Sequence, residues 1–69
     1  MKVMTSNSIY SVNTREKYVT GGVLGSNKLS YADVRNVKEG LRMEFFDAAG
    51  NLIMRTSSVK AIEPASTKH

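Results

Sequence analysis

The segment GLRMEFFDAAGNLIMRTS, residues 40–57, constrains the fold of this chain more than any other. Its first part alternates apolar and charged side chains with the period of two that a half-buried strand shows: Leu41, Arg42, Met43, Glu44 and Phe45. The next residues, DAAGN at 47–51, are turn formers, including a glycine and an asparagine that tolerate positive φ. The chain then returns as LIMRT, with Leu52 and Met54 expected on one face and Ile53 on the other. The segment therefore predicts an antiparallel β-hairpin.

The chain is too short to build a large apolar core. With 69 residues it is expected to be one domain, and a domain of this size buries only about 60% of the surface that its unfolded chain exposes. It has no cysteine and its one histidine is His69, so a disulfide and a Cys- or His-based metal site are both excluded. Aliphatic side chains must supply the core, and self-association would be a natural supplement. We expect no metal and no cofactor.

The N-terminal third also has β character and ends in a glycine-rich loop. The segments KVMT, SIYSV and KYVTGGVLG favour strands, with a turn at residues 13–16. The stretch VTGGVLGSNKLSY, residues 19–31, raises the question of a phosphate-binding loop, but that motif needs its lysine directly after the last glycine. Here two residues separate Gly25 from Lys28. We therefore predict a strand that bends at residues 21–22, followed by a surface loop.

The middle of the chain carries signals for a helix. In LSYADVRNVKEG, residues 29–40, Ser30 would be the N-cap and Asp33 the acidic residue of a capping box. The glycine at the end of the segment stands where a helix C-terminus favours one. We expect a short helix over residues 31–39. The alternative is a single helical turn followed by a strand that starts at Asn36.

The C-terminal segment completes the expected sheet. Residues 59–63 favour a last strand, and Pro64 ends its pairing because proline has no N–H to donate. Residues 64–69 are expected to form a flexible tail, which leaves residues 1–63 as a single small β-rich domain. We predict a mainly β fold (small α+β), an antiparallel bent sheet or small barrel of about five strands with one short helix around residues 31–39.

The order of these elements resembles that of small SH3-like or Sm-like barrels. The resemblance rests on the early glycine-rich bend and on RTSSVKAIE, residues 55–63, which is similar to the one-turn interruption and last strand of such barrels. It spans most of the chain and implies short, strongly bent strands. Barrels of this kind bind proteins, RNA or DNA, so the resemblance implies a binding function without choosing the partner.

Charge favours an acidic partner, and the residues give no sign of catalysis. Ten Lys and Arg against six Asp and Glu give a formal charge of +4, spread singly along the chain. An internal histidine, a cysteine or a recognisable carboxylate pair would point to an enzyme, and none is present. No apolar run approaches the roughly 20 residues of a membrane helix, and no signal peptide is recognisable. We expect a cytoplasmic protein that is not an enzyme and has no small-molecule substrate or membrane partner.

The hairpin offers a candidate contact surface for a protein partner. If Phe45 points inward, Phe46 should point outward, beside Ile53 on the returning strand. The alternative is a sheet that is covered on both faces. We predict a non-catalytic binding module that acts through protein–protein contacts at Phe46 and Ile53 and that self-associates as a homodimer.

The N-terminal hairpin offers a second surface and an alternative function. Tyr10 and Tyr18 are interleaved with Arg15 and Lys17. Proteins that bind single-stranded nucleic acid use aromatic side chains to stack on the bases and basic side chains to contact the phosphates. The alternative interpretation places both tyrosines in the core. These four residues are the candidate contacts of a small basic nucleic-acid-binding domain.

Overall fold

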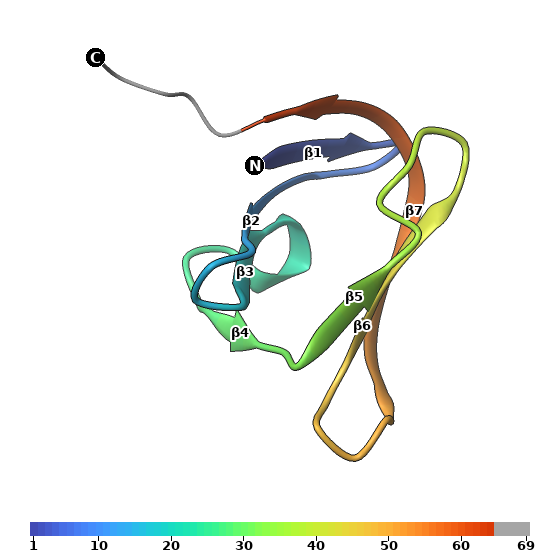
Figure 1. Ribbon diagram of the computed structural model, residues 1–69. Coiled ribbons are helices and arrows are strands. Elements are labelled where there is room, and N and C mark those ends of the chain that lie inside the picture. Colours follow the sequence, from blue (N-terminus) through green and yellow to red (C-terminus); the bar gives the residue numbers. More distant parts are fainter. Residues whose placement is uncertain (65–69) are drawn as a thin grey trace.

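The structure is a computed structural model that describes residues 1–64 (Figure 1). These residues form seven strands and one short 3-10 helix, η1: β1 (Lys2–Thr5), β2 (Ile9–Asn13), β3 (Tyr18–Gly21), η1 (Gly22–Leu24), β4 (Leu29–Ser30), β5 (Asp33–Arg35), β6 (Arg42–Phe46) and β7 (Leu52–Glu63). The mainly β prediction is confirmed, with more strands than expected. Except for Pro64, the predicted tail of residues 64–69 lies outside the described residues.

All seven strands belong to one strongly curled antiparallel sheet, a half-barrel with the order β4-β3-β2-β1-β7-β6-β5. The curl depends on β7, which bends so that one end lies beside β6 and the other beside β1 (Figure 1). The two outermost strands, β4 and β5, are neighbours in sequence. Between them, the amide of Tyr31 donates to the carbonyl of Lys17 (3.0 Å) and that of Ala32 to the carbonyl of Phe46 (2.8 Å). The short segment from β4 to β5 therefore bonds to both halves of the sheet.

The core fills the concave side of the curl. Its buried apolar residues come from strands across the sheet and from the link between β4 and β5: Val3, Tyr10, Val12, Val19, Tyr31, Met43, Phe45 and Val59. Tyr31 packs edge-on against Phe45, with ring centroids 5.0 Å apart, and its hydroxyl donates to the carbonyl of Asn13 (3.3 Å). Burial raises the pKa of Tyr31. One ring therefore ties the two halves of the sheet together.

The hairpin predicted at residues 40–57 is confirmed as β6 and the first part of β7. Met43 and Phe45 point inward and are fully buried, as the alternation predicted, whereas Leu41 precedes β6 and is exposed. The loop is organised by Asp47. Its carboxylate accepts the amides of Ala49 (3.0 Å) and Asn51 (2.9 Å), and its own amide donates to the carbonyl of Asn51 (2.9 Å).

The stability of this loop is expected to depend on pH through Asp47. The hydrogen bond from the Asn51 amide is the main cause that lowers the pKa of the Asp47 carboxyl. A lowered folded pKa means that the carboxylate stabilises the protein above its unfolded pKa of about 3.9, and that this contribution is lost as pH falls through the lower folded value. Asp47→Asn should therefore melt at a lower temperature than wild type at neutral pH. The gap should close in acid, as thermal melts across the pH range would show. A gap that persists below the folded pKa would contradict this role.

The helix predicted over residues 31–39 is wrong. The segment instead contains the buried residue Tyr31, strand β5 and the loop that follows β5. Among the described residues, η1 is the one helical element. The Asp33 carboxylate accepts the amide of Val34 (2.9 Å) instead of capping a helix. The alternative, a strand from Asn36, is wrong as well, because Asn36 has φ 64° and lies in the loop after β5. Pairing with β6 and burial of Tyr31 outweigh the local helix signals.

The glycine-rich loop bends where the sequence predicted. Strand β3 ends at Gly21, whose φ is 99°, and η1 follows at once. The Gly21 amide donates to the carbonyl of Gly25 (2.8 Å), which closes the loop on itself. A Cβ at Gly21 would collide with the carbonyl oxygen of Ile9 on β2. The glycine is therefore required by a close approach of two backbones and not by a bound phosphate.

Candidate functional site

Three neighbouring apolar residues of the β6–β7 hairpin reach the surface: Phe46, Leu52 and Ile53. We call these three residues the outer patch. Phe46 pairs directly with Leu52 across the two strands, and the register shifts between Phe45 and Phe46. Leu52 is 46% exposed and Ile53 36% exposed, while Phe46 is half-buried. The outer patch thus presents apolar surface to solvent at an irregular part of the sheet, where the register of β6 and β7 shifts.

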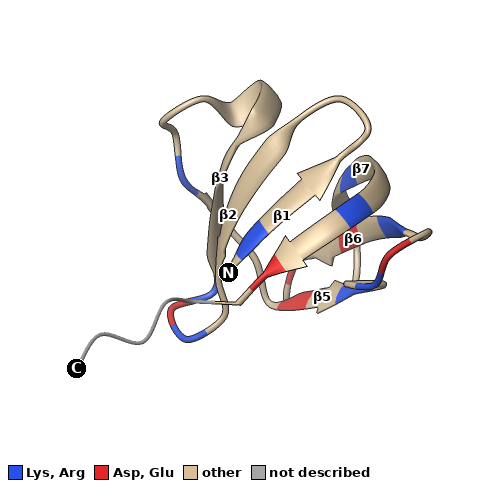
Figure 2. Ribbon diagram, turned by 90° about the horizontal axis from the view of Figure 1, so that it is seen from above, with Lys and Arg blue, Asp and Glu red and all other residues tan. Residues whose placement is uncertain are grey.

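Charged side chains border the outer patch and neutralise one another. The guanidinium carbon of Arg35 lies 5.1 Å from the centroid of the Phe46 ring, and Arg35 also pairs with Asp33 (Nε–Oδ2, 3.3 Å). Arg55 pairs with Glu44 across the hairpin (Nη2–Oε2, 2.9 Å). Figure 2 shows acidic and basic positions side by side on β5. Two positive and two negative charges cancel here, although the whole chain carries +4.

The structure brings together the two residues predicted for protein contact and adds a third. Phe46 is half-buried and Ile53 is 36% exposed, so both reach the surface. Leu52 was expected to share a face with Met54, but Met54 packs against the core while Leu52 is exposed. Phe45 pairs with Met54 and Phe46 with Leu52, so Ile53 is the extra residue of a bulge. A bulge breaks the period of two, and the sequence carries no residue-level mark of it.

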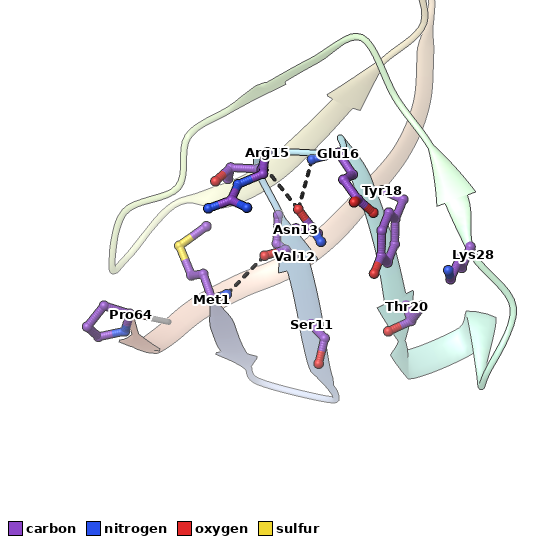
Figure 3. A pocket seen from close by; sticks show the side chains of 11 residues that line it. Met1, Ser11, Val12, Asn13, Arg15, Glu16, Tyr18, Thr20, Lys28 and Pro64 are labelled. Atoms are coloured by element: carbon purple, nitrogen blue, oxygen red, sulfur yellow. Dashed lines mark hydrogen bonds between the residues drawn. The ribbon is translucent and has the colours of Figure 1, made fainter. Parts of the chain in front are cut away.

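A second feature is an open hollow on the convex side of β2 and β3, which we call the β2–β3 hollow (Figure 3). It has a volume of about 880 Å³. Its lining is mixed and exposes more apolar than polar surface, although most of its residues carry a polar group: Met1, Ser11, Val12, Asn13, Thr14, Arg15, Glu16, Tyr18, Thr20, Lys28 and Pro64. The Lys28 ammonium lies 4.5 Å from the centroid of the Tyr18 ring, a cation–π contact. The hollow thus combines an aromatic ring with basic groups.

The turn between β2 and β3 is built by Asn13. Its side-chain oxygen accepts the amides of Arg15 (3.1 Å) and Glu16 (2.8 Å), as drawn in Figure 3. Lys17 then takes the left-handed conformation, with φ 58°, before β3 begins. The carboxamide fixes the backbone from which Arg15 and Glu16 extend into the hollow, which explains the placement of these two charged residues.

Of the four residues predicted for nucleic-acid contact, two line the hollow. Arg15 and Tyr18 do so. The prediction that Tyr10 contacts nucleic acid is wrong. Tyr10 is only 5% exposed and belongs to the core, where its ring lies against Gly22. Lys17 is exposed but does not line the hollow, and its ammonium donates to the carbonyl of Ala32 (3.3 Å). Each tyrosine has one apolar and one polar neighbour in the sequence, so the local pattern could not separate them.

Lys28 is the residue of the hollow that the sequence analysis missed. It was considered only as the lysine of a phosphate-binding loop, and its spacing from the last glycine excluded that motif. The strand pairing of Tyr18 with Ser30 brings the end of the glycine-rich loop back over β3, and with it Lys28. Contact with Tyr18 therefore depends on a pairing between residues twelve positions apart, which the local sequence pattern does not show.

Three further findings concern metal sites, membrane-spanning helices and similarity to known proteins. Among residues 1–64, no three His, Cys, Asp or Glu side chains lie close enough together to hold a metal ion. In the same part of the chain, no helix has the length and apolar character needed to cross a membrane. Comparison of the chain with models of protein families, with curated proteins and with solved structures finds no match.

Proposed function

We propose that this protein is a non-catalytic binding module that self-associates through the outer patch. The observation that carries the proposal is the apolar surface that Phe46, Leu52 and Ile53 present at neighbouring positions of the β6–β7 hairpin. Burying apolar surface is worth about 25 cal/mol per Å², and aromatic side chains in the centre of an interface supply much of its affinity. A chain of 69 residues, with a correspondingly small core, gains most from such burial.

The charges around the outer patch favour a second copy of the chain as the partner. Two copies that each carry +4 repel one another. The repulsion is weakest where the charges cancel, as they do for Arg35 with Asp33 and Arg55 with Glu44. A two-fold interface places each pair near its counterpart, so that partners can be exchanged between the two copies.

Docking of faces is favoured over addition of a strand at the edge of β5. The Val34 amide is already bound by the Asp33 carboxylate (2.9 Å). A strand added at this edge would have to displace that bond and bring its backbone beside a charged side chain. The face that carries the outer patch has no such obstacle. We also propose that the curled sheet is a variant of the SH3-like barrel, with the segment from β4 to β5 bonded to both halves of the sheet.

Sedimentation velocity tests the proposal. Wild-type protein should shift from monomer to dimer between about 1 µM and about 1 mM, the range of weak interfaces. Leu52→Lys should remain monomeric, because it places a charge in the centre of the outer patch. Val23→Lys is the matched control: Val23 is 85% exposed on η1, outside the outer patch, and its variant should dimerise like wild type. A monomeric wild type, or equal loss in both variants, would contradict the proposal.

A further inference from the structure

We propose that the β2–β3 hollow binds single-stranded nucleic acid, with Tyr18 stacking on a base and Lys28 and Arg15 contacting phosphates. This site lies on strands other than those of the outer patch, and the inference does not depend on self-association. Tyr18 is half-buried and lines the hollow, so part of its ring is anchored and part is accessible. Stacking on such rings is how proteins hold single strands with little sequence preference.

The basic groups at the hollow take part in no ion pair among residues 1–64 and can therefore contact phosphates. The three ion pairs among residues 1–64 use Lys2, Arg35 and Arg55. Arg15 and Lys28 take part in none of them, and neither does Lys17 on the adjoining turn. Glu16 is the one acidic residue in the lining, so this group of three basic residues and one acidic residue has a net charge of +2.

Binding of a nucleotide at this site would replace the contact between Lys28 and Tyr18. Lys28 now covers the ring at 4.5 Å. A base that stacks on the ring takes the place of the ammonium, and the flexible lysine side chain can then reach the phosphate of the same strand. The hydroxyls of Ser11 and Thr20 also line the hollow and can bond to the sugar–phosphate backbone.

The ring itself is held in place by strand pairing on both sides. Tyr18 pairs with Asn13 on β2 and with Ser30 on β4. A platform on paired strands loses little conformational freedom on binding, which favours affinity. A single strand fits this site better than a duplex does, because only unpaired bases expose a face to stack. An acidic peptide would satisfy the charges but would leave the ring without a stacking partner.

Fluorescence anisotropy with a labelled single strand of about ten thymidines, at low salt, tests the inference. Wild type should bind, and Tyr18→Ala should weaken binding at least 5-fold. Tyr18→Phe keeps the ring and should bind like wild type, which separates stacking from any loss of folding. Lys28→Glu should weaken binding further, whereas Lys38→Glu should have a small effect. The latter makes the same charge change in the loop between β5 and β6.

Two more measurements make the inference specific. Glu16→Gln should strengthen binding, since it removes the acidic group from the hollow. With two or three phosphates contacted, log affinity should fall against log salt with a slope of about −1.4 to −2. Undetectable binding at tens of micromolar would overturn the inference. So would equal binding of the same sequence as a duplex, equal effects of Lys28→Glu and Lys38→Glu, or binding of polyglutamate in place of the oligonucleotide.

Discussion

Replacing Phe45 with alanine is expected to leave the protein largely unfolded. Phe45 is fully buried, and its ring packs against Tyr31 across the sheet. Removing a buried phenylalanine costs about 3 to 5 kcal/mol, and a domain of this size has a total stability of about the same magnitude. The loss should therefore abolish the cooperative unfolding transition in urea, as followed by circular dichroism.

The neighbouring phenylalanine provides the matched control. Phe46→Ala removes the same side chain from the convex side, where it is half-buried, and should cost only about 1 to 2 kcal/mol. The comparison must be made at a protein concentration below that of self-association, so that only the fold of the monomer is measured. Equal destabilisation by the two changes would mean that the assignment of the two faces of β6 is wrong.

Gly21→Ala is expected to have the second largest effect, about 2 to 5 kcal/mol. Gly21 has φ 99°, a conformation that costs an L-residue about 1 to 2 kcal/mol. In addition, its Cβ would collide with the carbonyl of Ile9 on β2, and a backbone that must shift to relieve such overpacking adds about 1 to 3 kcal/mol. Strands β2 and β3 would be pushed apart at this point.

Gly40→Ala separates the two contributions. Gly40 has a similar φ of 90°, but a Cβ there meets nothing within 4 Å. This variant should therefore lose only the conformational part, about 1 to 2 kcal/mol. Each kcal/mol lowers the melting temperature of a domain this small by about 4 to 8 °C, so thermal melts resolve the difference. Equal shifts in the two variants would contradict the close approach at Gly21.

The hairpin could be predicted from the sequence because its determinants are local. The alternation that ends at Phe45 and the turn chemistry of residues 47–51 depend on neighbours a few positions apart. The bend at Gly21 could be predicted from the two adjacent glycines, but the close approach to Ile9 that requires Gly21 could not. The exposed position of Leu52 could not be predicted in this way, because the bulge at Ile53 breaks the period of two and no residue in the sequence marks it.

The segment around Asp33 shows the opposite case. Its local signals favour a helix, and a short helix has little stability of its own. The strand form gains the pairing of β5 with β6 and the burial of Tyr31 against Phe45. Both gains come from residues nine to fourteen positions away, so a pattern within the segment could not show them. Placement of Lys28 over Tyr18 depends on another distant pairing, that of Tyr18 with Ser30, so only Arg15 and Tyr18 of the β2–β3 hollow could be predicted from the sequence.

Self-association through the outer patch is the central claim, and an NMR dilution series tests it most directly. Amide resonances of ¹⁵N-labelled protein would be recorded from about 1 mM down to about 10 µM, the range over which a weak dimer dissociates. Concentration-dependent shifts should concentrate on residues 44–46 and 52–55, with the β5 amides that flank them, while those of residues 9–13 stay constant. Shifts confined to another face, or none at any residue, would contradict the claim.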